Sequence, residues 1–261
     1  MIKLQMTIAS LTLYRPIKVN IVLPYGHLVG NPPYKALWLL HPAMEDENFF
    51  LDKLSMLGEA DRQDIALISP GLGNGYFLNS CIEQQSDFLS NELLPCIQAN
   101  FPISSSPQDN FLIGISMGAF GATLWGVKTP DAFSAIAAIS GVYDPRLPLD
   151  ERALKDRTIR PFIKILGEKV MNRLMLDAHG QLRPEADIES LLARNAPNRP
   201  RFNFMCGDRD YLSLAQTENM AAVCQRYGLD VSTEFSPGLH NLDYWFRAVK
   251  NAINWISNFE R

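Results

Sequence analysis

The amino-acid sequence predicts an α/β fold, in which a mostly parallel central sheet carries helices on both faces. Short apolar runs that suit strands buried on both faces recur along the chain, for example at residues 36–40 and 65–69. Amphipathic stretches that suit helices lie between such runs, as at residues 214–227. Strand–helix alternation of this kind favours a parallel sheet, because parallel neighbours need long crossover connections.

Composition and charge place the chain among ordinary globular proteins. Hydrophobic residues make up 47% of its 261 positions and charged residues 20%, which suits one domain spanning residues 1–261. The 24 basic and 28 acidic residues give a net charge of −4, so we expect no binding to nucleic acid or to an anionic membrane. No apolar run has the length of a membrane span or of a secretion signal, so we expect a cytoplasmic protein. A homo-oligomer is compatible with the sequence.

Four cysteines, Cys81, Cys96, Cys206 and Cys224, lie far apart and form no C-x-x-C pair. Each stands in an apolar or helical stretch, which favours buried thiols over a zinc site or a disulfide framework. We expect neither a metal nor an organic cofactor.

Strands and helices are expected to alternate along most of the chain. Strands are expected at residues 11–14, 19–22, 36–40, 65–69, 111–113, 133–139, 202–206 and 231–235. Helices are expected at residues 46–63, 81–100, 119–128, 214–227 and 242–259, and a turn at residues 30–33. Residues 71–75 contain three glycines and resemble half of a dinucleotide-binding fingerprint. Pro70 intervenes and no helix begins at once, so we interpret this stretch as a flexible loop.

Residues 144–200 depart from this alternation. Charged amphipathic helices, with Pro and Gly between them, are expected at residues 160–175 and 184–195, the second with Pro184 in its first turn. We interpret the segment as a helical insertion, which is either an ordinary surface feature or a lid over the site.

Residues 114–118 (Gly-Ile-Ser-Met-Gly) stand between a predicted strand and a predicted helix. In this setting, G-x-S-x-G is the nucleophile elbow of α/β-hydrolases, a turn that presents the serine hydroxyl. Glycines on both sides of Ser116 allow a sharp turn without a Cβ clash. The backbone N–H of Met117 is then one expected donor to an oxyanion. Because such patterns also occur in ordinary glycine-rich turns, the partners of Ser116 decide the interpretation.

A serine nucleophile needs a histidine base and a carboxylate, which follow it in that fold in the order Ser, Asp or Glu, His. Of the four histidines (His27, His41, His179 and His240), only the last two follow the elbow. His179 lies in the polar insertion, where we expect an exposed side chain. His240 follows the last predicted strand, where the base must lie. The preceding strand ends in Cys206-Gly207-Asp208-Arg209-Asp210, and spacing alone does not choose between its two carboxylates.

Motifs along nearly the whole chain resemble those of a known family. They are Leu39-Leu40-His41, Asn74-Gly75-Tyr76, Glu92-Leu93-Leu94-Pro95, residues 114–118, residues 206–212 (Cys-Gly-Asp-Arg-Asp-Tyr-Leu), Gly238-Leu239-His240 and Tyr244-Trp245. In this order they resemble the esterase D family of α/β-hydrolases, closest to tributyrin esterases and similar to S-formylglutathione hydrolases and feruloyl esterases. The resemblance implies Ser116 as nucleophile, His240 as base and, as the last Asp of C-G-x-x-D-x-L, Asp210 as the third member.

The resemblance also implies a second oxyanion donor, the backbone N–H of Ala43. Pro42 stands where the family has glycine, and proline cannot adopt a positive φ. If that glycine needs a positive φ, the Ala43 N–H points elsewhere. Leu242 replaces a tryptophan common in relatives. Nearby acidic residues, Glu45 to Glu47, either disfavour anionic acyl groups or form a solvated helix start.

The resemblance and the residues together predict hydrolysis of carboxylic esters, with short acyl chains, through an acyl-enzyme on Ser116. The expected partner is a small-molecule ester. A thioesterase or an acyltransferase would use the same three residues. A binding protein that has lost its oxyanion hole is a further alternative, for which Pro42 is the indication.

Overall fold

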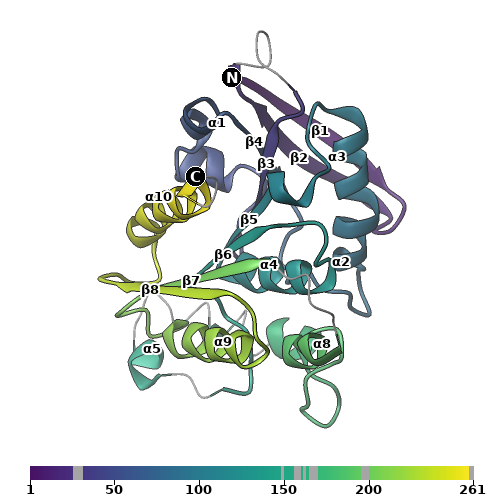
Figure 1. Cartoon of the computed structure of the whole chain (residues 1–261). Coiled ribbons are helices and arrows are strands. Elements are labelled where there is room, and N and C mark those ends of the chain that lie inside the picture. The colour runs from purple at the N-terminus through teal and green to yellow at the C-terminus, as the bar shows by residue number, and fades with distance from the viewer. Residues whose placement is uncertain are drawn as a thin grey trace.

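An eight-stranded sheet forms the centre of the computed structural model, which describes residues 1–25, 32–147, 150–155, 160, 163–164, 170–194 and 200–258. The strand order is β1-β2-β4-β3-β5-β6-β7-β8 (Figure 1). β1 pairs antiparallel with β2, and β2 pairs antiparallel with β4. All other neighbours are parallel, as the sequence predicts.

The elements alternate through most of the chain. The strands are β1 (Ile2–Ser10), β2 (Arg15–Leu23), β3 (Lys35–Leu40), β4 (Ile65–Pro70), β5 (Asn110–Ile115), β6 (Ala135–Ile139), β7 (Arg201–Gly207) and β8 (Val231–Ser236). The helices and helical turns are η2 (Phe49–Lys53), α1 (Leu57–Gln63), α2 (Gln85–Asp87), η3 (Phe88–Leu93), α3 (Leu94–Asn100), η4 (Pro107–Asp109), α4 (Met117–Lys128), α5 (Glu151–Lys155), α7 (Asn172–Met175), α8 (Ile188–Arg194), α9 (Leu214–Arg226) and α10 (Leu242–Asn258).

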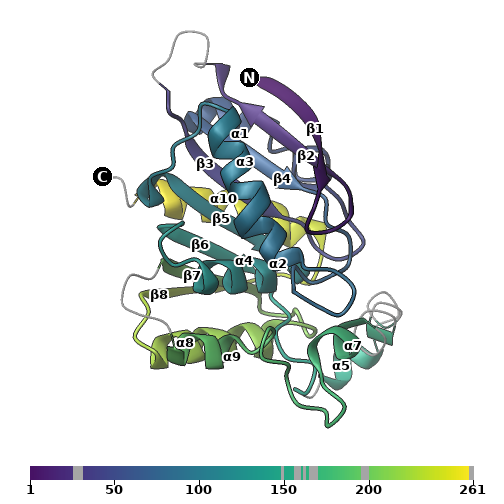
Figure 2. The ribbon, with the colours of Figure 1, turned by 90° about the vertical axis from the view of Figure 1, so that its right-hand side faces the viewer.

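The two faces of the sheet bury separate apolar cores, because side chains alternate along each strand. Trp38 of β3 belongs to the core under α3, α4 and α9, where it packs edge-on against Trp125 with 5.7 Å between ring centroids. Its neighbour Leu37 belongs to the other core, which α1 and α10 cover (Figures 1 and 2). In a sheet covered in this way, the loops after the parallel strands meet at one edge, where α/β folds bind their ligands.

The strands predicted from residue 36 onward are confirmed, with ends that differ by up to two residues. Residues 19–22 lie inside β2, but the strand predicted at residues 11–14 is wrong, because these residues form the turn from β1 to β2. The Glu92 carboxylate holds this turn by accepting hydrogen bonds from the N–H groups of Leu11 at 2.8 Å and Thr12 at 3.0 Å. The Glu92 side chain, distant in sequence, therefore satisfies backbone N–H groups that a neighbouring strand would otherwise satisfy.

Three predicted helices need correction. The one at residues 46–63 is divided into η2 and α1, because Ser55 between them has a φ of 52° and interrupts the right-handed helix. The one at residues 81–100 begins only at Gln85. The one from Pro184 begins only at Ile188, because Asp187 caps α8 by accepting the Ser190 N–H at 3.0 Å.

The helices predicted at residues 119–128, 214–227 and 242–259 are confirmed as α4, α9 and α10. Some predictions lie outside the described residues: Gly30 and Asn31 of the predicted turn, residues 195 and 259 at two predicted helix ends, and much of the predicted helix at 160–175. His27 also lies outside them.

All four cysteines are free thiols, but they are not all buried as predicted. Cys206 and Cys224 are buried, Cys96 is half-buried and Cys81 is exposed. Cys81 precedes the first helical residue of its segment, which explains its exposure. Among the described residues, no helix has the length and apolarity to cross a membrane.

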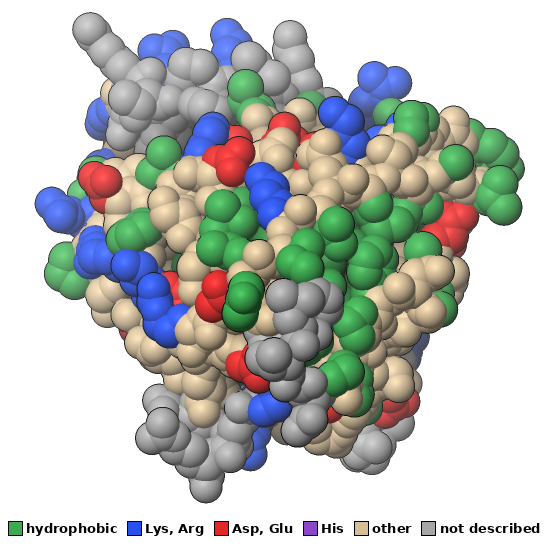
Figure 3. All heavy atoms as spheres, turned by 90° about the horizontal axis from the view of Figure 1, so that it is seen from above, with side chains coloured by type: hydrophobic (Ala, Val, Ile, Leu, Met, Phe, Trp, Pro, Cys, Tyr) green, Lys and Arg blue, Asp and Glu red, His purple; other side chains and the backbone are tan. Residues whose placement is uncertain are grey.

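The surface seen from above mixes charges of both signs. Lys and Arg side chains lie beside Asp and Glu side chains there, and hydrophobic side chains gather on one part of the same face (Figure 3). The mixed charges agree with the small net charge of −4.

Candidate active site

The turn at Ser116 joins β5 to α4 in a conformation that few residues adopt. Ser116 has φ 54° and ψ −112°, and its N–H donates to the Ile139 carbonyl of β6 at 2.8 Å. A Cβ at Gly114 would lie 2.0 Å from the Gly118 carbonyl oxygen, and one at Gly118 would lie 1.9 Å from that of Leu40. Gly114 and Gly118 are therefore needed because other backbone segments pack closely against them. The strained backbone conformation of this turn belongs to Ser116 itself.

The structure brings the three predicted catalytic side chains together from the loops after β5, β7 and β8. The Ser116 Oγ lies 3.1 Å from Nε2 of His240, and Nδ1 of His240 lies 2.8 Å from Oδ2 of Asp210. Because a carboxylate accepts, Nδ1 carries the proton and Nε2 is left to accept the serine hydroxyl. This is the arrangement that activates a serine hydroxyl.

The Asp210 carboxylate is buried, yet it is held in its charged form. Burial raises the pKa of Asp210, but the electrostatic attraction to His240 and hydrogen bonds from His240 and Ser213 outweigh this effect, so the pKa lies below its usual value. The Ser213 N–H donates to Oδ1 at 3.1 Å, and the Ser213 Oγ lies 3.4 Å from Nδ1 of His240. Ser213 is not among the predicted site residues, although its position three residues after an Asp is typical of a turn that such a carboxylate stabilises.

Asp208, the other carboxylate of this loop, has a different role. It is exposed, and its Oδ1 accepts the Gly238 N–H at 3.1 Å. It therefore braces the loop that carries His240 and does not touch the imidazole. The structure thus separates two residues that spacing could not separate.

The imidazole of His240 has an aromatic neighbour on the next helix. Trp245 of α10 packs edge-on against it, with 5.0 Å between ring centroids. Phe246, the next residue of α10, is exposed beside Lys250. Leu242 is exposed as well. His179, as expected, is exposed.

The loop after β3 lies against the elbow. The tight contact of Gly118 with the Leu40 carbonyl places residues 40–43 beside the N-terminus of α4. Among the described residues, neither the Met117 N–H nor the Ala43 N–H has a hydrogen-bond acceptor. Within the described part of the chain, no protein group therefore competes for either predicted oxyanion donor. The positive φ in this loop, 66°, belongs to Met44 and not to Pro42.

His41 lies outside the triad and holds two loops together. Its Nδ1–H donates to the Pro42 carbonyl at 2.8 Å, and its Nε2 accepts the Leu72 N–H at 3.2 Å. Complete burial lowers the pKa of His41 to about 4, which keeps the ring neutral and preserves this pattern. Residues 71–75, predicted as a loop, are thereby tied to the end of β3.

Acidic residues after this loop are engaged locally. Glu45 pairs with Lys53 at 2.6 Å, the Asp46 carboxylate accepts the Asn48 N–H at 2.8 Å, and Glu47 accepts from Gln5 at 3.2 Å. These contacts favour the structural interpretation over repulsion of anionic acyl groups.

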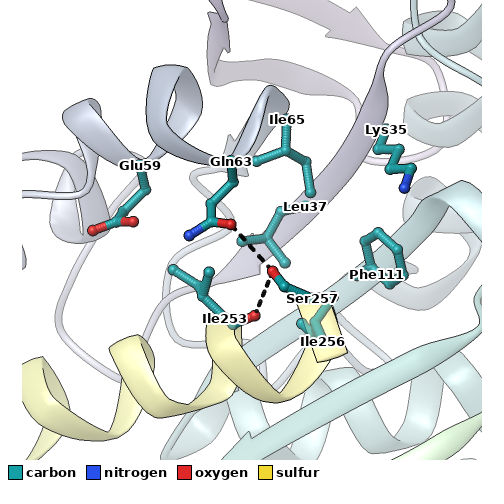
Figure 4. Close-up of a pocket in the computed structure, with 9 residues that line it drawn as sticks. All are labelled: Lys35, Leu37, Glu59, Gln63, Ile65, Phe111, Ile253, Ile256 and Ser257. Atoms are coloured by element: carbon teal, nitrogen blue, oxygen red, sulfur yellow. Dashed lines mark hydrogen bonds between the residues drawn. The ribbon is translucent and has the colours of Figure 1, made fainter. Parts of the chain in front are cut away.

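A small cavity at the opposite edge of the sheet does not coincide with this site. It lies between α1, α10 and the start of β3 and has a volume of about 20 Å³ (Figure 4). Ser257 closes it by donating to Gln63 at 3.2 Å. About one water molecule would fill such a space. No group of three His, Cys, Asp or Glu side chains within the described ranges could hold a metal ion.

Comparison with known proteins identifies the family. The model of the family described as "Putative esterase" matches residues 10–252. The chain belongs to this esterase family. An acetyl esterase of Caldicellulosiruptor saccharolyticus is 24% identical over 238 residues, which cover 88% of this chain and 85% of that protein. The chain is thus an esterase with the α/β-hydrolase fold that its elbow predicts.

Solved structures agree with this fold. The fluorophosphonate-binding serine hydrolase F of Staphylococcus aureus has a TM-score of 0.76 and 23% identity to this esterase, covering 98% of both chains. The S-formylglutathione hydrolase of the same organism has a TM-score of 0.75 and 22% identity, with the same coverage.

Proposed function

We propose that this esterase is a serine carboxylesterase in which Ser116 is the nucleophile, His240 the general base and Asp210 the residue that orients His240. The observation that carries the proposal is the continuous hydrogen-bond chain, 3.1 Å from Ser116 to His240 and 2.8 Å from His240 to Asp210. The unusual backbone of Ser116 between two obligatory glycines supports it, since strained residues concentrate at functional sites.

The reaction would proceed in two halves. The Ser116 Oγ attacks the ester carbonyl while Nε2 of His240 takes its proton, and the same nitrogen then protonates the departing alcohol. Water attacks the acyl-enzyme by the reverse proton path and releases the acid. Asp210, held charged, stabilises the imidazolium that forms in both halves.

The proposed oxyanion hole consists of the N–H groups of Met117 and Ala43. Support comes from their lack of an acceptor among the described residues and from the packing of the β3 loop against α4. One such donor is worth about 10²–10³ in turnover. Pro42 therefore affects the rate of hydrolysis indirectly, because it helps to set the direction of the Ala43 N–H.

The proposed substrates are small-molecule esters with short acyl chains, because an acetyl esterase is among the relatives. Thioester hydrolysis and acyl transfer to an alcohol would use the same groups. Matched O-acyl and S-acyl substrates, with and without an added alcohol, separate these reactions by the product formed. A finding that S-acyl substrates alone are hydrolysed would replace the carboxylesterase proposal.

The decisive test is the Ser116→Ala variant. We expect it to lose hydrolysis of p-nitrophenyl butyrate by a factor on the order of 10³ or more and to lose labelling by a fluorophosphonate, which reacts with activated serines. Circular dichroism should show an unchanged fold. Retained turnover by the folded variant would end the proposal, and an unlabelled wild-type protein would indicate a binding protein without catalysis.

We further propose a single catalytic domain over residues 1–261, with residues 144–200 as an insertion in it. Its place between β6 and β7, where α5, α7 and α8 lie, supports this division. Four free cysteines favour the reducing cytoplasm as its location. The net charge of −4 supports small molecules, rather than nucleic acid or membranes, as its partners, and a homo-oligomer is compatible with it.

A further inference from the structure

A second, larger cavity lies between residues 72–85 and the insertion. It has a volume of about 440 Å³, which suits part of a small organic molecule. Leu72 and Leu78 from the loop after β4, and Val170 and Leu174 from the insertion, give it apolar walls. Polar side chains from three segments complete the lining, among them Arg15, Asn74 and Arg173.

The side-chain acceptors that line this cavity are already occupied. Both Glu83 oxygens accept from Arg15, and Oε2 also accepts from Gln85 at 2.9 Å. The Gln85 Oε1 accepts the Phe77 N–H at 3.0 Å, and the Asn74 Oδ1 accepts the Met44 N–H at 2.7 Å. A ligand that offers only donors would therefore find few free acceptors.

Asn74 and Arg173 each present side-chain donors with no acceptor in the described part of the chain, as does Nη1 of Arg15. The Met44 N–H donates to the Asn74 Oδ1 and so fixes the orientation of this amide. The Asn74 Nδ2 has no acceptor among the described residues. The Arg173 guanidinium, with five N–H donors, likewise has no carboxylate or carbonyl partner in the described part of the chain. Arg15 and Glu83 cancel in charge, because the hydrogen bond from Arg15 keeps the pKa of Glu83 below its usual value. Arg173 therefore gives the described part of the lining a net positive charge.

This cavity shares a wall with the proposed oxyanion loop. Asn74 bonds to Met44, which follows Ala43 directly, and Leu72 bonds to His41. The same segment packs on α4, since a Cβ at Gly121 would lie 2.4 Å from the Phe77 ring. A group bound in the cavity would thus lie beside the loop that meets the reacting carbonyl.

We propose that this cavity binds the carboxylate end of an anionic ester, through the Arg173 guanidinium and the Asn74 amide, with an apolar stem against its leucine and valine walls. The proposal rests on the proposed esterase function and adds a charge preference to it. The carboxylate belongs either to the acyl group or to the alcohol, and both share this chemistry.

Matched ester pairs test the preference for an anion. On the alcohol side, p-(butanoyloxy)benzoate is compared with the corresponding benzamide. On the acyl side, mono-p-nitrophenyl glutarate is compared with its primary amide. The measured quantity is the ratio of kcat/KM for the anionic ester to that for the neutral one. We expect Arg173→Ala to lower this ratio about tenfold in one of the two arms. The arm that responds shows whether the carboxylate belongs to the alcohol or to the acyl group.

Two further variants make the test specific. Asn74→Asp keeps an oxygen for the Met44 N–H but replaces the free donor with a negative charge, so it should lower the ratio in the same arm. Arg62→Ala removes a positive charge from α1, at the other edge of the sheet, and should leave the ratio unchanged. Equal effects of Arg62→Ala and Arg173→Ala, or an unchanged ratio in both arms with Arg173→Ala, would overturn the proposal.

Binding without turnover separates this proposal from the proposed function. Calorimetry on Ser116→Ala should give about tenfold tighter binding of the anionic ester than of its neutral partner. The double variant with Arg173→Ala should not discriminate between them. If the wild type hydrolyses no ester, the proposed function fails, and the calorimetry still decides the cavity. If neutral and anionic esters bind equally to Ser116→Ala, the cavity proposal fails while the esterase function stands.

Discussion

Two carboxylates two residues apart have opposite environments in the loop after β7. Asp210 is buried against the imidazole, whereas Asp208 is exposed and accepts a backbone N–H. Conversion to Asn removes a negative charge in both cases but keeps one acceptor oxygen. The pair is therefore a matched comparison of a group that orients a base with a group that braces a loop.

We expect Asp210→Asn to lower kcat for p-nitrophenyl butyrate by about 10⁴, because an amide there can favour the wrong tautomer of His240. Asp208→Asn should lower it by less than about tenfold, since its oxygen can still accept the Gly238 N–H. Steady-state kinetics on both variants checks the assignment. Comparable losses would show that Asp208 contributes as much as Asp210.

At the scale of elements, the elbow depends on close packing of β3, β5 and α4. A Cβ at Gly118 would meet backbone atoms of Leu40, which cannot move aside as a side chain can. We expect Gly118→Ala to lower the free energy of unfolding by about 3 kcal/mol. Gly58→Ala in α1, where a Cβ meets nothing within 4 Å, should leave stability equal or raise it by up to about 1 kcal/mol. Urea unfolding of the two variants measures the difference, and equal midpoints would contradict the packing argument.

The loop from His41 to Met44 is the second element that the chemistry depends on. Hydrogen bonds at the Pro42 carbonyl and the Met44 N–H fix both sides of Ala43. Because proline further restricts the backbone, we expect Pro42→Gly to lower kcat several-fold by loosening the Ala43 N–H, and to cost about 1 kcal/mol in stability. A variant with a higher kcat than the wild type would show instead that Pro42 turns this donor away.

At the scale of the whole molecule, the buried His41 links stability to pH. The unfolded ring takes up a proton near pH 6.5, whereas the folded ring stays neutral down to about pH 4. The unfolded state therefore binds more protons between these values, and the free energy of unfolding decreases as the pH falls through this window. The contribution is about 3 kcal/mol.

The variant His41→Gln should lack this contribution. Its free energy of unfolding, measured in urea at several values between pH 6.5 and pH 4, should fall less steeply than that of the wild type. The slope is the relevant quantity, because the substitution also changes absolute stability. Parallel curves for the two proteins would rule out His41 as the source.

Much of this architecture could be predicted because its strands and the elbow have characteristic local patterns in the sequence. Buried strands are recognisable as short apolar runs, and the elbow and the position of His240 follow from strand ends. The turn at residues 11–14 could not be found in this way, because it depends on Glu92, about eighty residues away. The helix break at Ser55 likewise could not be placed from the sequence, because the residue with the positive φ is a serine and not a glycine.

The site shows the same limit. Sequence spacing left Asp208 and Asp210 equivalent, because only the spatial neighbour of each carboxylate distinguishes them. Ser213 and the buried His41 also gain their roles from contacts made across loops. Such contacts are set by the tertiary packing, which periodicity does not encode.

The brace at Asp208 has a consequence for motion. The Asp208 N–H donates to Ser236 at 2.9 Å, the Arg209 N–H to Gly238 at 3.0 Å, and the Gly238 N–H returns to Asp208. The pairing of β7 with β8 thus continues beyond the strands into the loops that carry Asp210 and His240. The Gly238 amide hydrogen should accordingly exchange slowly with deuterated solvent, and its exchange rate would report how often the acid and the base separate.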